Sequence, residues 1–401
     1  MTTSAKTITI GGVSSTSKVD AMGKTENGKT GKSEIAQNLP GSPTTAARRR
    51  VTLRDVATAA GVSLKTASNV INGTGRMTDA TRAKVEAVIE QTGYRVNVAA
   101  RNLNRDRTGF ITLAVPTLTA PYLSELANRV IDAARQRGYL VYVTTYAEGS
   151  ATGARELLRN FNTTVSDGMI LSMSEVEDIS PEDLEVDFPL VVVGARTTWG
   201  KADHVTPNDV QAAASAAGYM FDCGVKSLAV VGGRGAYDEA KLLGAVEGNA
   251  QLLGAVEGNA QLRLRGIIEE CRRRGVTLDS RLVGNVEQEW TIGAGAHATQ
   301  ELIDKGVPFD GVIGLNDQLA IGALTVMRAN GIEIPRQVQV IGFDNIEESQ
   351  YLQIPLTTMD SRLEWTAPTA VERILGRIRG EIAKPELLMT DCDVIVRDST
   401  R

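Results

Sequence analysis

The chain has 401 residues, of which 42% are hydrophobic and 23% are charged. This length exceeds one ordinary hydrophobic core, so we expect a soluble protein with two or three domains. No apolar run reaches the roughly 18–20 residues of a membrane span. The first residues, MTTSAKTITI, lack the basic start and apolar stretch of a secretory signal. We therefore expect a cytoplasmic protein with no membrane partner.

Cysteine and histidine are too few and too dispersed for a metal or disulfide framework. The three cysteines stand far apart, at positions 223, 271 and 392, and the chain has two histidines. This spacing fits neither a set of disulfides nor a zinc site. We expect reduced thiols, no metal and no cofactor.

Charge is distributed unevenly along the chain. Residues 1–107 carry 17 Lys and Arg against 8 Asp and Glu, whereas the remainder carries 26 against 40. A basic end joined to an acidic body is typical of a protein that contacts a polyanion with one end. Basic tails can also serve solubility alone, so charge leaves both interpretations open.

The N-terminal part divides into a polar tail and a compact helical block. Residues 1–50, rich in Ser, Thr, Gly and Lys, predict a disordered tail. Residues 51–93 predict three short helices. Thr52 and Asp55 have the spacing of a capping box, and Ser63 and Thr78 stand at the starts of the second and third helices.

The short turn at residues 61–63 predicts a helix-turn-helix, whose second helix enters the major groove of DNA. Lys and Asn side chains suit guanine and adenine edges, while hydroxyls suit phosphate oxygens. The candidate DNA contacts are Ser63, Leu64, Lys65, Thr66, Ser68, Asn69 and Asn72. On this pattern alone, a small helical bundle that binds another protein is the alternative.

From residue 109 onward, short apolar runs alternate with helical patterns. This order predicts an α/β fold with parallel sheets flanked by helices, and some 290 residues predict two such lobes. The expected strands are 110–115, 140–145, 168–171, 190–193, 227–231, 311–315 and 338–343. The expected helices are 122–137, 210–223, 262–274, 292–305 and 318–330.

One segment is duplicated. Residues 242–251 read LLGAVEGNAQ, and residues 252–261 repeat them without a change. Ten residues make about 2.8 helical turns, so a helix continued through the extra copy would turn its apolar face by roughly 80°. We expect the extra copy to be looped out or to lengthen a helix at the surface.

Several motifs in order resemble those of the lactose/galactose-repressor (LacI/GalR) family of transcriptional regulators. The segment VTLRDVATAAGVSLKTASNVING is similar to the family's DNA-binding head, and GYxxN, AxxL, NDQLAIGAL, IGFDN and PLTT follow, to about residue 397. The resemblance implies a three-helix head, a hinge helix and a two-lobed core like that of periplasmic binding proteins. It assigns residues 1–50 to a tail, 51–93 to the head, 94–108 to the hinge and 109–398 to an effector-binding and dimerising core.

The resemblance also implies functional residues. Asn97, Ala99, Ala100 and Leu103 match the hinge, where Leu103 would wedge between base steps in the minor groove. The alternative for Leu103 is a packing residue in a linker. Where the family commonly has Arg in the recognition helix this chain has Asn69, which puts the operator sequence in doubt.

In the core, Arg263, Trp290, Asn316 and Asp344 match the family's effector-contact positions, and Tyr122 is a further stacking candidate. Carboxylate, guanidinium and amide groups suit neighbouring hydroxyls of a sugar, and an indole face covers its C–H face. The alternatives are structural, since Asp344 could cap a turn and Trp290 could be core. Residues 194–196, Gly-Ala-Arg, stand where family members often have an acidic residue.

These features predict a repressor of carbohydrate-metabolism genes that binds double-stranded operator DNA as a homodimer or tetramer. Its expected effector is a sugar or sugar derivative. Two other classes compete. A transporter's solute-binding protein would not need residues 51–103, and an enzyme lacks support because no phosphate-binding loop or catalytic triad is evident. The sequence leaves open the effector, the operator, and whether the ligand releases or tightens DNA binding.

Overall fold

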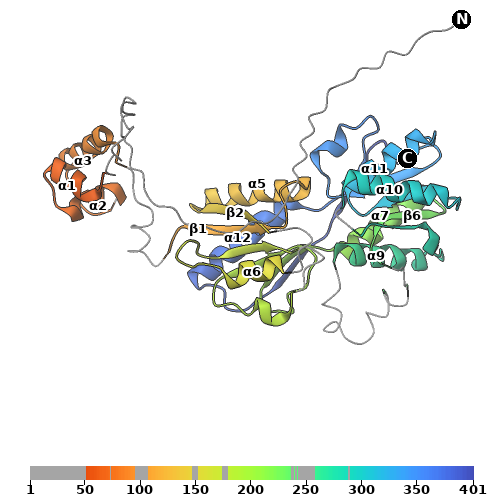
Figure 1. Cartoon of the computed structure of the whole chain (residues 1–401), viewed down its shortest axis with the longest axis horizontal. Helices are drawn as coiled ribbons and strands as arrows, with labels where there is room; N and C mark the ends of the chain where they lie inside the picture. Colours follow the sequence, from red (N-terminus) through yellow and green to blue (C-terminus); the bar gives the residue numbers. More distant parts are fainter. Residues whose placement is uncertain are drawn as a thin grey trace, which may run out of the picture. The chain divides into compact units, whose positions relative to one another are not determined.

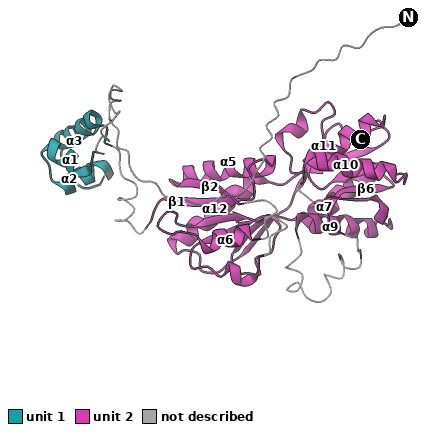
Figure 2. Ribbon diagram, viewed as in Figure 1, with its two compact units in different colours: residues 1–95 teal, residues 96–401 magenta. Residues whose placement is uncertain are grey.

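The computed structural model describes residues 51–72, 74–94, 107–146, 152–173, 179–235, 239, 242, 258–287 and 290–401 (Figure 1). The chain forms two compact units, residues 1–95 and 96–401 (Figure 2). We call the described part of the first unit the head and that of the second the core. The predicted tail, the hinge candidates Asn97, Ala99, Ala100 and Leu103, and most of the duplicated segment lie outside the described residues.

The head consists of α1 (Leu53–Ala60), α2 (Leu64–Asn72) and α3 (Asp79–Thr92). The predicted caps are confirmed. The Thr52 hydroxyl accepts a hydrogen bond from the Asp55 N–H, and the Asp55 carboxylate accepts one from the Thr52 N–H at 2.8 Å. Gly61 ends α1 in the left-handed region, at φ 59°, where a side chain would be strained.

The three helices enclose a small hydrophobic core. Its buried members come from every helix and are Val56, Ala60, Val70 and Val85. Met77 and Tyr94 pack against its edge. The head therefore depends on a few aliphatic contacts between helices.

The core contains two six-stranded sheets, each the centre of one lobe. The first sheet has the order β11-β5-β4-β3-β1-β2, and all its pairs are parallel. Its strands are β1 (Phe110–Val115), β2 (Leu140–Thr145), β3 (Met169–Ser172), β4 (Leu190–Val193), β5 (Asp203–Pro207) and β11 (Leu387–Thr390). In this first lobe, α5 (Pro121–Gln136) and α12 (Leu363–Arg379) pack on one face and α6 (Gly153–Arg159) on the other.

The second sheet has the order β12-β10-β9-β8-β6-β7, and its pairs are parallel except for β10 with β12. Its strands are β6 (Leu228–Gly233), β7 (Val283–Asn285), β8 (Gly311–Gly314), β9 (Gln339–Phe343), β10 (Thr357–Asp360) and β12 (Asp393–Ile395). Its helices are α7 (Asp209–Asp222), α9 (Asn259–Arg273), α10 (Ile292–Asp304) and α11 (Asp317–Ala329). Figure 1 shows α10 and α11 over one face of this second lobe and α7 and α9 over the other.

The chain passes between the lobes three times: from β5 to α7, from β10 to α12, and from β11 to β12. The predicted α/β class with two parallel-sheet lobes is confirmed. Ligands of such sheets bind outside the carboxyl ends of the strands, where chain direction changes. The first two crossings leave from the carboxyl ends of β5 and β10. The side chains that follow these two strands therefore lie where a ligand of the sheets would bind.

The sequence prediction missed β5, β7, β10, β11, β12, α6 and α12, and two of these show why. β5 reads Asp-His-Val-Thr-Pro, which lacks an apolar run, yet every residue in it is buried. Asp203 is buried because Arg373 and Arg377 each donate to its carboxylate at 2.6 Å. α12 contains Pro368 in its interior, a residue that normally argues against a helix. No helix in these described parts is long and apolar enough to cross a membrane.

Candidate functional site

The start of α2 is the first candidate surface. Ser63 caps it: its Oγ accepts a hydrogen bond from the Thr66 N–H at 3.0 Å and lies 2.8 Å from the Thr66 Oγ1. Lys65 is exposed, and Leu64 keeps 47% of its surface accessible. A helix start carries partial positive charge, so these hydroxyls and the ammonium suit a phosphate-rich partner.

Two other candidates in this helix are placed differently. A Cβ added at Gly75 would meet the Asn69 Nδ2 at 2.8 Å, so the Asn69 amide lies against the turn that follows α2. Ser68 is partly buried. The side chain of Asn72 lies outside the described residues. Lys65 is therefore an exposed candidate for reading bases, whereas Ser68 and Asn69 are partly buried.

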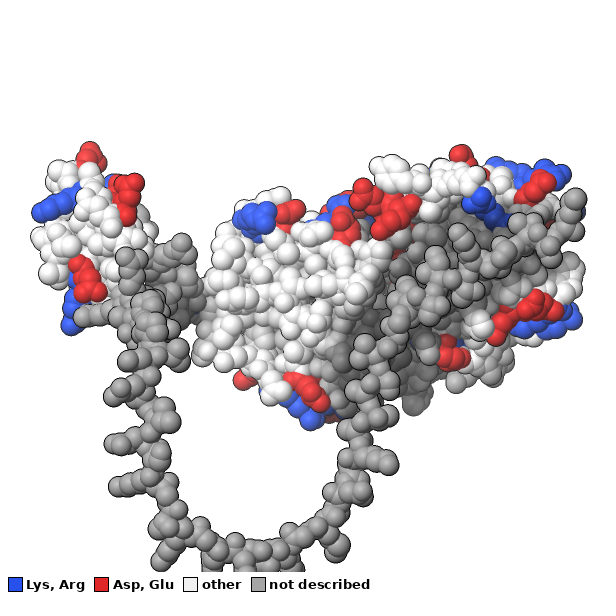
Figure 3. Space-filling view, turned by 45° about the horizontal axis from the view of Figure 1, so that its top comes forward, with Lys and Arg blue, Asp and Glu red and all other residues white. Residues whose placement is uncertain are grey.

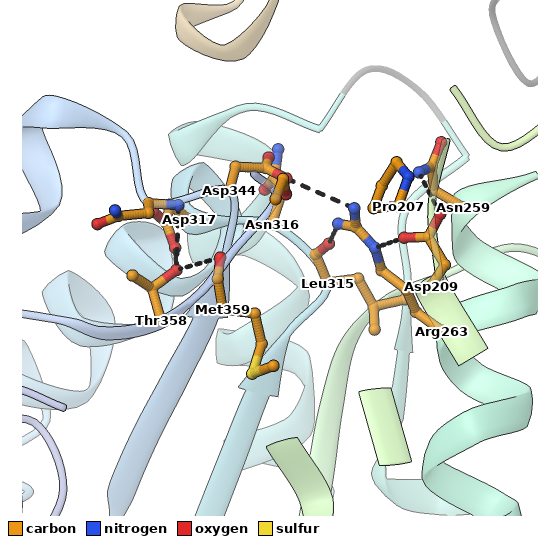
Figure 4. Close-up of polar contacts among 12 residues, drawn as sticks. Pro207, Asp209, Asn259, Arg263, Leu315, Asn316, Asp317, Asp344, Thr358 and Met359 are labelled. Atoms are coloured by element: carbon orange, nitrogen blue, oxygen red, sulfur yellow. Dashed lines mark hydrogen bonds and ion pairs between the residues drawn. The ribbon is translucent and has the colours of Figure 1, made fainter. Parts of the chain in front are cut away.

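In the core, Arg263 is the centre of a buried polar network (Figure 4). Its side chain projects from α9, and the residue is 4% exposed. Its Nε donates to the Asp209 carboxylate at 2.6 Å, and one terminal nitrogen donates to the Leu315 carbonyl at 2.5 Å. The other terminal nitrogen lies 3.5 Å from the Asp344 carboxylate. We call Asp209, Arg263, Leu315 and Asp344 the Arg263 network.

Asp344 follows β9 with φ 102°, a backbone conformation that side chains rarely adopt. Its carboxylate also accepts a hydrogen bond from the Ser361 hydroxyl at 3.1 Å. Burial raises the pKa of Asp344, and the neighbouring Arg263 guanidinium opposes that rise. The strained backbone aims a carboxylate at the guanidinium, and strain of this kind is commonly found at binding sites.

A second buried carboxyl lies next to this network. Asp317 starts α11 and accepts hydrogen bonds from the Thr358 hydroxyl at 2.5 Å and the Ile346 N–H at 3.0 Å. Burial, together with the charge of Asp344, holds the pKa of Asp317 well above its usual range. Asp317 therefore joins the loop after β9 to the start of β10.

Asn316 and Trp290 form a neighbouring pair. The Asn316 amide oxygen caps α11 by accepting from the Leu319 N–H at 2.8 Å, and its nitrogen donates to the Trp290 carbonyl at 3.3 Å. The Trp290 ring is half-buried, and its Nε1 is buried with no hydrogen-bond partner among the described residues. The Arg234 guanidinium lies 5.8 Å from the centre of that ring.

A cavity of about 530 Å³ separates the two lobes beside the Arg263 network. One wall is the start of α5, including Tyr122, and the opposite wall is residues 344–348 together with Gln350. Burial raises the pKa of Tyr122, and so do the carboxylates of Asp344 and Asp209. We call this cavity the inter-lobe cleft. Its volume is within the range typical of small-molecule sites.

The structure thus brings Tyr122, Arg263 and Asp344 together, with Asn316 adjacent through Leu315. The cleft lining includes Tyr122 and Asp344, whereas Arg263 is enclosed by its partners. The departure noted at 194–196 lies elsewhere: Arg196 is buried within the first lobe and does not line the cleft.

Sequence reasoning missed Asp209, Asp317 and Ser361. Asp209 stands at the carboxyl end of β5, which was itself unpredicted, so its position beside Arg263 could not be read. Asp317 was visible within the NDQLAIGAL motif but was not singled out. The available signal was an acidic residue directly before a predicted helix and after a predicted strand, the usual place for a ligand contact in parallel sheets.

Comparisons with known proteins agree with this architecture. Residues 52–97 match the model of bacterial regulatory proteins of the lacI family, and residues 250–400 match a periplasmic binding protein-like domain. A LacI-type transcription regulator from Bifidobacterium animalis subsp. lactis is 30% identical. Its solved structure gives a TM-score of 0.63, with 72% of this chain and 99% of that chain covered. The chain belongs to the LacI family.

Other LacI-family members match over most of the chain. The transcriptional repressor CytR of Escherichia coli is 27% identical over 87% of this chain and 96% of its own length. The structure of the regulator CelR in complex with cellobiose is 26% identical, with a TM-score of 0.62 and coverage of 87% and 100%. The protein is therefore a DNA-binding transcriptional regulator with a periplasmic-binding-protein-like core.

Proposed function

We propose that this regulator represses carbohydrate-metabolism genes in the cytoplasm and is controlled by a neutral sugar or close relative bound in the inter-lobe cleft. The observation that carries the proposal is the Arg263 network beside a cavity of about 530 Å³. The Asp344 carboxylate lines the cleft and can hold two neighbouring hydroxyls, and the enclosed Arg263 guanidinium holds that carboxylate in place. The aromatic ring of Tyr122, which lines the cleft, suits the apolar face of a sugar ring, and Trp290, beside Asn316 and outside that lining, is a further stacking candidate. The assigned activity is binding, with no catalytic step.

In the head, we propose that residues 51–93 bind operator DNA and that 94–108 are the hinge, with 109–398 as the effector-binding and dimerising core. Lys65 would contact base edges, with Ser63 and Thr66 on phosphates. Two heads on one dimer require two half-sites related by a two-fold axis. CelR, which is similar over nearly the whole chain, was solved with cellobiose, and this supports a sugar as effector.

A sugar screen by thermal shift, followed by calorimetry and operator gel shifts, tests the proposal. A ligand that binds the native state raises its apparent stability. Asp344→Ala should lose the ligand response and keep operator binding, because Asp344 belongs to the core and not to the DNA-binding head. Asp304→Ala, at the far end of α10, should keep both. A folded protein that binds no sugar contradicts the effector assignment.

The hinge has its own test, because Leu103 is proposed to wedge between base steps. Leu103→Ala should reduce operator bending in a gel assay while the head stays folded. Bending equal to that of the wild type would assign Leu103 to packing.

A further inference from the structure

The side chains that line the inter-lobe cleft are unevenly charged. One lining residue is basic, Arg129, and six are acidic. The acidic residues are Glu125, Asp344, Glu347, Glu348, Asp360 and Glu364. In the view of Figure 3, acidic side chains gather in one group at the upper edge of the core, whereas elsewhere on that face red and blue side chains lie close together.

The nearby cations are already engaged. Arg129 pairs with Glu125 at 2.7 Å. Arg362 pairs with Glu364 at 2.8 Å and with Asp393 at 2.7 Å. Arg397 also lies behind this wall, where it donates to the Asn345 side chain at 2.6 Å and its charge acts on Asp360. It is one cation against the several remaining carboxylates of the lining.

Three lining carboxylates have no ion pair among the described residues: Glu347, Glu348 and Asp360. Glu347 and Glu348 are exposed at the start of the short helix that follows β9. Asp360 accepts a hydrogen bond from the Arg362 N–H at 2.9 Å, which is a neutral donor. The wall of the cleft on this side is therefore anionic.

The Arg263 network does not reverse this balance. Arg263 is one cation shared by two carboxylates, those of Asp209 and Asp344. Two of its three nitrogens already donate to Asp209 and to Leu315. An anionic ligand would thus gain little from the guanidinium and would face Asp344 at the same time.

Helix starts at the cleft also offer few donors to an anion. α5 begins there with Pro121, which has no N–H. The other long helix that begins at the cleft, α12, carries Glu364 in its first turn, so a carboxylate already lies beside its N–H groups. The usual anion site at a helix N-terminus is therefore reduced at both positions.

We infer that the inter-lobe cleft selects its ligand by charge: it accepts an uncharged or amine-bearing sugar and rejects the phosphate ester of the same sugar. This inference rests on the proposed function, because it specifies the chemical class of the effector in that cleft. An ammonium group would complement the unpaired carboxylates. A phosphate dianion would be repelled by them and would find no free cation among the described residues of the lining.

Matched ligand sets test the inference on the full-length protein. Calorimetry would compare glucose, glucosamine and glucose-6-phosphate, then the galactose set, and ribose with its phosphate ester. For the sugar that binds, the phosphate ester should bind at least about tenfold more weakly, and the amine form about threefold more tightly at low salt. The amine's advantage should shrink as salt rises, because the wall carboxylates are exposed.

Two double variants separate charge selection from a general change in net charge. Glu347→Gln/Glu348→Gln removes two carboxylates from the cleft. It should reduce the affinity gap, the ratio of the Kd of the phosphate ester to that of the parent sugar, by about threefold or more. Glu301→Gln/Asp304→Asn changes the charge equally at the far end of α10 and should leave the gap unchanged.

Three outcomes overturn the inference. A phosphate ester that binds as tightly as its parent sugar refutes charge selection and leaves the sugar effector standing. A control variant that narrows the gap as much as the cleft variant refutes it as well. A folded protein that binds no member of any set refutes the sugar effector, and the charge inference with it.

Discussion

The head and the core present their polar recognition groups in opposite ways. In the head, Lys65 is exposed on one short helix, and the helix is capped by its neighbour Ser63. In the core, Arg263 is 4% exposed and is held by groups from three separate segments. In the head, a partner can reach these side chains without rearrangement. In the core, the polar groups form a buried hydrogen-bonded network, the Arg263 network, beside the inter-lobe cleft.

The two regions also differ in what stabilises them. The described head buries six aliphatic side chains, four of which form its core cluster. The second lobe alone buries a continuous cluster from both faces of its sheet, with Phe343 among its largest members. Substitutions in the Arg263 network should therefore lower the free energy of unfolding, whereas substitutions at Lys65 should lower the affinity for operator DNA.

The largest expected effect is on the core. Arg263→Met leaves Asp209 and Asp344 buried without their cation, which should cost about 3–5 kcal/mol of unfolding free energy. Arg135→Met removes an exposed pair with Asp132 and should change stability by less than about 0.5 kcal/mol. Urea denaturation measures both. Equal small losses would mean that the network contributes no more than a surface pair.

In the head, Lys65→Ala should weaken specific operator binding by about 1–3 kcal/mol and relax sequence preference, with no loss of stability. Lys65 is exposed, so its removal leaves no buried group unpaired. Lys226→Ala makes the same charge change on the core and should leave affinity unaltered. Competition gel shifts with mutated half-sites measure the preference. Unchanged discrimination by Lys65→Ala would assign this side chain to phosphate contact.

The buried carboxyl Asp317 predicts that the stability of the core depends on pH. Its pKa is raised in the folded state, so the native protein keeps a proton that the unfolded chain releases as pH rises above about 4. Stability should therefore fall relative to Asp317→Asn, by at most about 1.4 kcal/mol per pH unit, until the folded-state pKa is passed. Urea midpoints from pH 5 to 8 measure this. A constant difference between the two proteins would contradict it.

The smallest expected effect concerns the duplicated segment. Residues from the end of the second copy start α9: the Gln261 side chain accepts from the Gly258 N–H at 3.0 Å, and Asn259 lies 3.4 Å from Asp209. Because the copies are identical, deletion of 252–261 leaves the first copy to provide the same residues before Arg263. Unfolding free energy and operator affinity should change by less than about 0.5 kcal/mol. A larger loss would show that both copies are needed.

Local spacing was sufficient to predict much of the head. The capping boxes and N-caps of Thr52, Ser63 and Thr78 involve residues three positions apart, so the amino-acid order alone specifies them. The same holds for the strands and helices whose apolar runs are continuous. The family motifs further placed Arg263 and Asp344 in one functional group, although they are 81 positions apart.

The remaining features depend on partners that are distant in the sequence. Asp203 and His204 are polar residues in a buried strand. Asp203 is tolerated there because Arg373 and Arg377, about 170 positions away, pair with it. Asp209 is part of the Arg263 network only because β5 ends beside α9, and no local pattern predicted β5. Spacing along the chain specified caps and periodic helices, whereas the tertiary structure decided which buried charges meet, because a buried charge is stable only beside a partner that folding brings to it.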